Sequence, residues 1–220
     1  MMKVNISLLA ALGAGLACGI VGCRSVGCTT RFVYATWNIG HYSRGGSWKS
    51  TVPPEDGERR AADYRAFLDR IGADVVGVCE YAEDFTTNGS MKASAALFGG
   101  YPGRSVGPSR SYQWNAQFWK GFGALERKTV DYVERHQKVY YQATRLEIGG
   151  EDVWIVQTHL DWTTFMKGFE RYRERQMQKL IDDFRDKPRV IGEFFCYIFK
   201  KEKKFSFQSK NLNHLRKGGA

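Results

Sequence analysis

The stretch VWIVQTHLD, residues 153–161, decides the fold, because it is an apolar run that ends in His159 and Asp161. Two earlier runs end in the same way: TWN at residues 36–38 closes on Asn38, and VVGVCE at residues 75–80 closes on Glu80. Apolar runs bounded by turn residues are typical of buried strands, and a polar residue at the end of such a strand is held on a rigid element. The three endings together predict one shared site where strand ends converge.

Strands and helices alternate outward from these runs. We expect strands over residues 31–38, 74–80, 112–120, 138–148, 153–161 and 189–191, and helices over residues 58–71 and 168–184. Gly72 is placed to cap the first helix, and Gly149-Gly150 predicts a hairpin turn. Residues 41–57 and 85–111 are expected to be loops, the second with a short helix near residues 91–98. This alternation predicts an α/β layered domain.

The composition is that of one globular domain with a basic excess. The chain has 220 residues, of which 43% are hydrophobic and 25% charged, and its net charge is +10. A basic balance favours polyanionic partners. However, residues 196–220 hold seven Lys and Arg against one Glu, so +6 of the charge lies in this basic tail. The rest of the chain is only mildly basic, and its charge alone does not predict a nucleic-acid surface.

Residues 1–23 have the form of a targeting segment. Lys3 precedes the apolar, Gly-rich stretch 6–22, which is short for a membrane span and favours a secretory signal. Residues 20–23, IVGC, resemble a bacterial lipobox, in which Cys23 becomes the lipidated N-terminus; a plain signal peptide or a membrane anchor is the alternative. Residues 24–30 would be a tether. We therefore expect an exported bacterial lipoprotein, anchored in the membrane at the periplasm or the cell surface.

The polar residues at the strand ends can have either a structural role or a functional one. Glu80 closes an almost wholly apolar strand, so its carboxylate must be paired with an arginine or bound to a hard cation. Asn38 is either a turn former or a cation neighbour. His159 and Asp161 share one side of a period-two strand and suit contact with a phosphoryl oxygen, although a structural histidine is equally open. Both interpretations remain open from the residues alone.

Two further segments bear on a site. Tyr112, Trp114 and Asn115 lie on a strand that would border the same cleft, where aromatic residues serve packing more often than substrate contact. Cys79 lies inside an apolar run and is expected to be buried. No Cys or His spacing typical of zinc sites is present in the sequence.

Taken in order, these motifs resemble those of the endonuclease/exonuclease/phosphatase superfamily of metal-dependent phosphoesterases. The matching pieces span about residues 31–195: ATWNIG (35–40), DVVGVCEY (74–81), YQWNAQFWK (112–120), VQTHLDW (156–162), and RERQMQKLIDDF (173–184) followed by PRVIGEFF (188–195). The resemblance implies a four-layer α/β sandwich of two mixed sheets flanked by helices. It also implies a hydrolase that acts on phosphate esters, whether nucleic acid, phospholipid or sugar phosphate, and works as a monomer.

The resemblance also implies roles for single residues. Glu80 would hold the divalent cation, Mg²⁺ or else Mn²⁺ or Ca²⁺, with Asn38 in support. His159, with Asp161 beside it, would bind a phosphoryl oxygen. Asn115 would be a site neighbour by this resemblance, and Tyr112, from its place on the same strand, is the second candidate for substrate contact. Glu193 would orient the attacking water.

The chain departs from the superfamily pattern at its C-terminal end. Glu193 stands where the superfamily motif GDFN has Asp, and Phe195 stands where it has Asn. No SDH sequence follows, and residues 196–220 have no clear periodicity. We therefore expect a chain truncated or frameshifted after about residue 195, without the C-terminal strands, and weak hydrolysis; a natural divergent C-terminus is the alternative. The alternative function is that of a non-catalytic exported lipoprotein, or a remnant, that binds polyanions through its basic tail.

Overall fold

The computed structural model describes residues 6–10, 16–25, 28–42, 52–108, 114–132, 139–160, 171–187 and 189–195. For residues 6–10, 16–25, 28–31, 41 and 193–195 it describes the backbone alone. Tyr112, Asp161 and the basic tail lie outside the described residues.

The first sheet has six strands in the order β1-β2-β3-β4-β6-β5. Their bounds are β1 Ile6–Ala10, β2 Leu16–Ser25, β3 Cys28–Asn38, β4 Val75–Cys79, β5 Gly103–Val106 and β6 Ala116–Trp119. β3 and β4 run parallel, with Asn38 beside Cys79, and the other pairs are antiparallel. The sheet is therefore mixed, and its two parallel strands end at the same edge.

The second sheet has four strands in the order β10-β9-β8-β7. Their bounds are β7 Gly123–Asp131, β8 Tyr140–Ile148, β9 Glu151–His159 and β10 Val190–Phe195. β8 and β9 form the predicted hairpin, because Ile148 pairs with Glu151 across Gly149 and Gly150, which have φ values of 61° and 76°. β10 runs parallel to β9, so this sheet is mixed as well.

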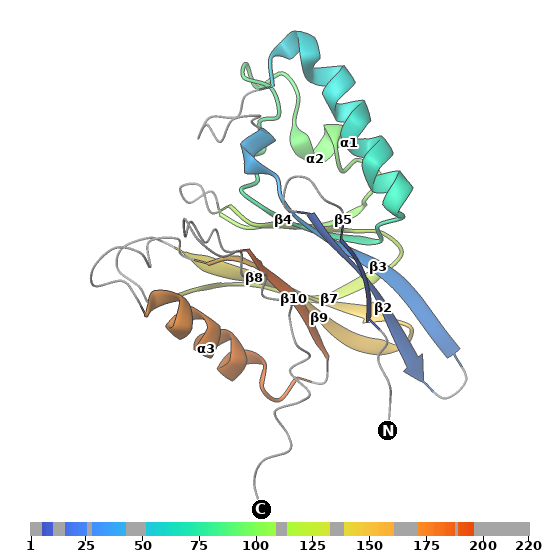
Figure 1. Cartoon of the computed structure of the whole chain (residues 1–220), viewed down its shortest axis with the longest axis vertical. Helices are drawn as coiled ribbons and strands as arrows, with labels where there is room; N and C mark the ends of the chain where they lie inside the picture. The colour runs from blue at the N-terminus through green and yellow to red at the C-terminus, as the bar shows by residue number, and fades with distance from the viewer. Residues whose placement is uncertain are drawn as a thin grey trace, which may run out of the picture.

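Helices cover the outer face of each sheet, which gives four layers (Figure 1). α1 Gly57–Ile71 and the short α2 Ala93–Ala96 lie on the first sheet, and α3 Tyr172–Phe184 lies on the second. Two 3₁₀ turns, η1 Gly40–Tyr42 and η2 Pro54–Asp56, precede α1. The predicted α/β sandwich of two mixed sheets flanked by helices is confirmed. No helix among the described residues is both long and apolar enough to span a membrane.

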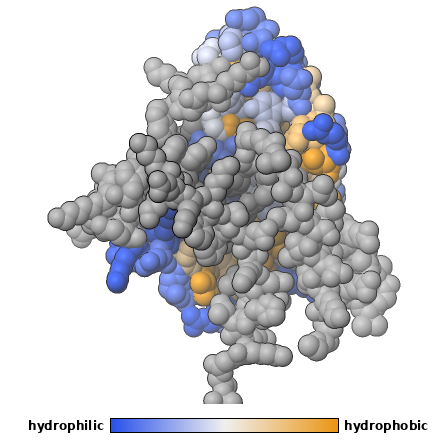
Figure 2. Space-filling model, viewed as in Figure 1, coloured by the Kyte–Doolittle hydropathy of each residue, from blue (hydrophilic) through white to orange (hydrophobic). Residues whose placement is uncertain are grey.

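Three apolar clusters hold these layers together. The cluster between the sheets consists of Phe32, Tyr34, Val75, Trp119, Leu146, Ile148, Val153 and Ile155. α1 buries Ala61 and Leu68 against the first sheet and ends at Gly72, whose φ of 63° is the left-handed cap predicted there. Its polar face meets solvent, and the top of the molecule is mostly hydrophilic in Figure 2.

α3 is held on the second sheet by apolar packing and one polar contact. Leu180 and Phe184 pack against Trp154 and Tyr141. The Tyr141 hydroxyl donates a hydrogen bond to Asp183 Oδ2 at 2.6 Å. Burial, followed by this bond, raises the pKa of Tyr141 above its ordinary value. Burial alone would raise the pKa of Asp183, but the bond from Tyr141 and nearby lysine charges outweigh it and lower that pKa.

The sequence-based boundaries were wrong in three places. The segment 85–111 contains strand β5, and residues 121–131, to which no element was attributed, contain β7. Both are edge strands, and most β7 side chains are exposed or half-buried, so neither shows an apolar run. β10 continues to Phe195, beyond the predicted end at residue 191.

The N-terminal segment is described as two strands. β1 and most of β2 lie within the expected leader, residues 1–23, and β3 begins inside the expected tether, at Cys28. Removal of the segment on export remains a prediction.

Candidate functional site

The candidate site lies where the carboxyl ends of β3, β4 and β9 meet. β3 and β4 are parallel neighbours, so Asn38 ends its strand beside Cys79, and Glu80 follows directly. β9 belongs to the facing sheet, but its end lies close to that of β4, because the Cys79 thiol is 3.5 Å from the carbonyl oxygen of Thr158. The two sheets thus bring His159 next to residues from the first half of the chain.

Glu80 has a backbone conformation that is rare outside glycine. Its φ is +53°, in the left-handed region. Backbone hydrogen bonds on either side hold this turn: Ile39 N–H donates to the Cys79 carbonyl at 3.0 Å, and Tyr81 N–H donates to the Trp114 carbonyl at 3.0 Å. Left-handed non-glycine residues are enriched at functional sites, because their surroundings must offset an unfavourable conformation.

Three side chains converge on one another at this edge. The Asn38 amide donates from Nδ2 to Glu80 Oε1 at 2.9 Å, and its Oδ1 accepts from Gly40 N–H at 3.0 Å. His159 Nε2 lies 3.2 Å from the same Glu80 oxygen, within ion-pair distance but without hydrogen-bond geometry. The His159 side chain is 3% exposed and that of Glu80 18%, and Asn38 is half-buried, so solvent reaches the carboxylate and the amide rather than the imidazole.

Asn115 lies at the same end of the first sheet. β6 begins beside the end of β4, with Ala116 opposite Val78. Asn115 is fully buried, donates through Nδ2 to the Tyr140 carbonyl at 3.2 Å, and donates through its backbone N–H to the Tyr140 hydroxyl at 2.9 Å. Its Oδ1 has no hydrogen-bond partner within the part of the chain that the structure describes.

The remaining predicted site residues are placed less completely. Tyr112 and Asp161 lie outside the described residues, so their roles stay predictions. Glu193 and Phe195 are described by their backbone, which sets Glu193 beside Gln157 and Phe195 beside His159 in the parallel β9–β10 pair. The segment that resembles GDFN therefore ends at the same sheet edge as His159.

Gln157 is the neighbour that the sequence interpretation missed. It is fully buried, and its amide contacts Tyr34 on β3 and Cys79 on β4. A signal existed, because an amide inside the apolar run VWIVQTHLD requires a buried partner.

The donor set suits a hard cation held by few protein ligands. Among the described residues, no three His, Cys, Asp or Glu side chains group closely enough to hold a metal ion. One carboxylate with neighbouring amide groups fits Mg²⁺, which keeps several waters and commonly takes one or two carboxylates plus substrate phosphates. Glu80 would be that ligand, and Asn38, which donates to it, would orient it.

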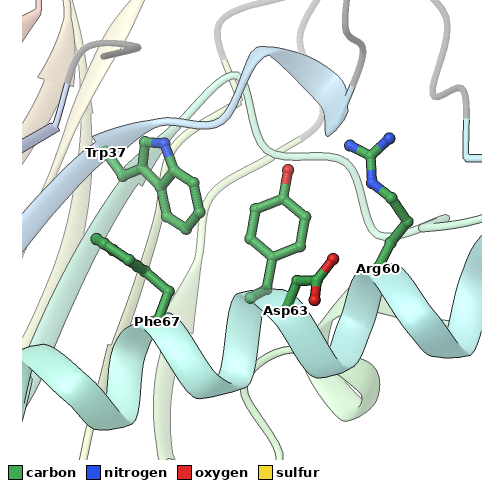
Figure 3. A pocket seen from close by; sticks show the side chains of 5 residues that line it. Trp37, Arg60, Asp63 and Phe67 are labelled. Atoms are coloured by element: carbon green, nitrogen blue, oxygen red, sulfur yellow. The ribbon is translucent and has the colours of Figure 1, made fainter. Parts of the chain in front are cut away.

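A pocket of about 280 Å³ lies on the other face of the first sheet, between β3 and α1 (Figure 3). It is lined by Trp37, Arg60, Asp63, Tyr64 and Phe67. Trp37 precedes Asn38 on β3, and its ring packs on Tyr64 of α1. This pocket is therefore separate from the cluster of Asn38, Glu80 and His159.

Comparison with solved structures shows the same fold in known phosphoesterases. No protein-family model matches the sequence, and no curated protein matches it significantly. A humanized D. rerio TDP2 superposes with a TM-score of 0.54 at 13% identity, covering 73% of this chain and 59% of that one. D. rerio TDP2 complexed with single-strand DNA product gives 0.55 at 13% identity, covering 73% and 58%.

ANGEL2, described as a 2',3'-cyclic phosphatase and bound to adenosine-2',3'-vanadate, gives a TM-score of 0.53 at 12% identity, covering 87% of this chain and 56% of its own. TDP2 and ANGEL2 are members of the endonuclease/exonuclease/phosphatase superfamily. At these identities the likeness shows the fold alone. This chain spans less than two thirds of the length of each of the three structures.

Proposed function

We propose that this chain is a divalent-metal-dependent phosphoester hydrolase domain, with its cation and phosphate sites at the ends of β3, β4 and β9. The observation that carries the proposal is the convergence of Asn38 and His159 on one oxygen of Glu80, at 2.9 and 3.2 Å. These are three of the residues for which the order of motifs implied a role. The fold shared with TDP2 and ANGEL2 supports the same reaction class.

Each residue has a distinct task in this proposal. Glu80 would hold the cation through its carboxylate, and a cation held there would supply Lewis-acid polarisation of a phosphoryl group. Asn38 fixes the Glu80 carboxylate by donating to Oε1. His159, whose ring lies beside Glu80, would donate from that ring to a phosphoryl oxygen. Asn115 would place its buried Oδ1, a hydrogen-bond acceptor, at the same end of the sheet.

The substrate class in this proposal is a phosphodiester of nucleotide type. The support comes from two neighbours: one is complexed with single-strand DNA product, and another holds adenosine-2',3'-vanadate. Phospholipid and sugar phosphate are the competing substrates, and a hydrolysis panel containing all three separates them.

Turnover should be weak, because the water-orienting position is altered. Glu193 is one methylene longer than the Asp of the superfamily motif, and Phe195, beside His159 in the β9–β10 register, offers no hydrogen bond. Removal of one group from a catalytic set commonly costs several orders of magnitude in rate. Binding of the cation is therefore a better test of the proposal than turnover.

The test is calorimetric titration of the full chain with Mg²⁺ and with Mn²⁺, together with an EDTA-controlled hydrolysis assay. Glu80→Gln should abolish cation binding and any EDTA-sensitive hydrolysis. Glu58→Gln, the same chemical change at an exposed position on α1, is the matched control and should leave binding unchanged. Equal cation binding by the wild type and Glu80→Gln would refute the proposal.

We also propose that the chain is exported as a lipoprotein anchored through Cys23. The support is the apolar segment 6–22 followed by Cys23 in the sequence IVGC. Expression in a bacterial host with radiolabelled palmitate should label the wild type and not Cys23→Ser. Equal labelling of the two chains, or none of the wild type, contradicts the anchor.

A further inference from the structure

We propose that Gln157 is a positioning residue that sets the distance between Glu80 and His159. The proposal rests on the proposed function, because it concerns the geometry of the same site. Gln157 lies two positions before His159, so the two residues share one face of β9. Its partner Cys79 comes directly before Glu80. One buried amide thus joins the two strands whose ends carry the site.

Both the oxygen and the nitrogen of the Gln157 side-chain amide make hydrogen bonds. Oε1 accepts a hydrogen bond from the Tyr34 hydroxyl at 2.9 Å and lies 3.5 Å from the Thr36 hydroxyl, both on β3. Nε2 donates to the Cys79 sulfur on β4 at 2.8 Å. The side chain therefore ties β9, in one sheet, to the two parallel strands of the other. A charge-neutral group with a donor and an acceptor at this length is required for that connection.

The absence of a side chain at Gly77 leaves the space that this amide occupies. Gly77 lies on β4 opposite Gln157, and a Cβ atom there would be 2.1 Å from Gln157 Oε1 and 2.6 Å from the Tyr34 hydroxyl. Neither atom could stay in place beside such a carbon. A glycine at residue 77 thus lets β4 approach the amide, and both strand ends are held at the observed spacing.

A purely structural role would predict only a loss of stability, so a matched control is needed. Gln142 is 1% exposed and pairs with Gln157 in the β8–β9 register, but its Nε2 donates to Ser105 on β5, away from Glu80 and His159. Gln142→Leu and Gln157→Leu remove the same group from the same layer. Both should lower the stability, while only Gln157→Leu should change the site.

The first measurement is cation affinity by calorimetry, with each variant at a temperature where it is fully folded. Partners that orient a metal ligand from outside commonly contribute 10–100-fold in affinity. We expect Gln157→Leu to weaken Mn²⁺ binding by about tenfold or more, and Gln142→Leu to change it less than about threefold. Equal losses in the two variants, or no loss in Gln157→Leu, overturn the proposal.

The second measurement needs no cation and no turnover. A double-mutant cycle with Glu80→Gln and His159→Asn gives the coupling between these side chains from urea unfolding. The coupling should fall in the Gln157→Leu background and persist in the Gln142→Leu background. Coupling that is unchanged in the Gln157→Leu background overturns the positioning role. If the wild type binds no cation, the proposed function fails, and this cycle still decides the role of Gln157.

Discussion

Gly77→Ala is the sharpest test of how the two sheets fit together. The substitution adds one carbon on β4, at a position with no left-handed backbone strain to consider. That carbon would lie 2.1 Å from Gln157 Oε1, 2.6 Å from the Tyr34 hydroxyl and 3.0 Å from Gln157 Cδ. Non-bonded heavy atoms attract best at about 3.5–4.0 Å, so either the amide or β4 must move.

The expected cost follows from what that movement breaks. Overpacking of a filled core costs about 1–3 kcal/mol. Displacement of the amide also weakens the bond from Tyr34 and the contact with Cys79, each worth about 1 kcal/mol in net stability. Movement of the amide relieves part of the overpacking but weakens the hydrogen bonds, so the two costs do not add in full. We therefore expect Gly77→Ala to lower the free energy of unfolding by about 2–4 kcal/mol.

Urea unfolding followed by circular dichroism measures this loss. Gly123→Ala is the matched control, because a Cβ at Gly123 meets nothing within 4 Å and its φ is not left-handed; it should be neutral or stabilise slightly. Gly77→Ala should also cost much less in a Gln157→Ala background, where the obstructing amide is gone. A neutral Gly77→Ala, or the same cost in both backgrounds, would refute the reasoning.

Four further outcomes are expected. Leu68→Ala should lower the free energy of unfolding by about 2–5 kcal/mol in urea, because Leu68 is 2% exposed in the α1 core. Gly72→Ala should cost about 1 kcal/mol in the same assay, since φ is 63° at this helix cap, and Gly72→Asn should cost less. Asn38→Ala should weaken Mn²⁺ binding by about tenfold in calorimetry, because Glu80 loses its 2.9 Å donor; unchanged affinity contradicts this role. The lowered pKa of Asp183 stabilises the fold above its unfolded pKa of about 4, and this contribution is lost as pH falls through the folded pKa. Tyr141→Phe returns that pKa toward its ordinary value, so urea midpoints should fall less steeply with pH below about 4 than in the wild type.

The parts of the fold that the sequence predicted are those with a strong local signal. α1 shows apolar residues at helical spacing and a glycine cap, and both features appear where expected. The β8–β9 hairpin follows from two adjacent glycines, which can take positive φ at no steric cost. β7 escaped prediction because it lies at a sheet edge and none of its side chains is fully buried. An edge strand is specified by its pairing partner rather than by its own pattern.

In the site, too, the features with a local sequence signal were predicted and those set by tertiary packing were not. The polar ends of the apolar runs correctly located Asn38, Glu80 and His159 at strand ends. The distances between these side chains could not be predicted from the sequence, because His159 ends a strand of the second sheet whereas Asn38 and Glu80 lie at strand ends of the first. The left-handed φ of Glu80 was equally hidden, since neighbouring backbone hydrogen bonds rather than its residue type impose it.

The assembly of the site from two sheets has a consequence for how its geometry is controlled. Within the first sheet, the β3–β4 ladder fixes Asn38 relative to Glu80. No backbone ladder joins β4 to β9, so the 3.2 Å separation of Glu80 and His159 depends on side chains packed between the sheets. Interiors packed to crystal-like density transmit such changes rather than absorbing them. Buried substitutions at Gly77 or Gln157 should therefore disturb the site more than exposed substitutions closer to it.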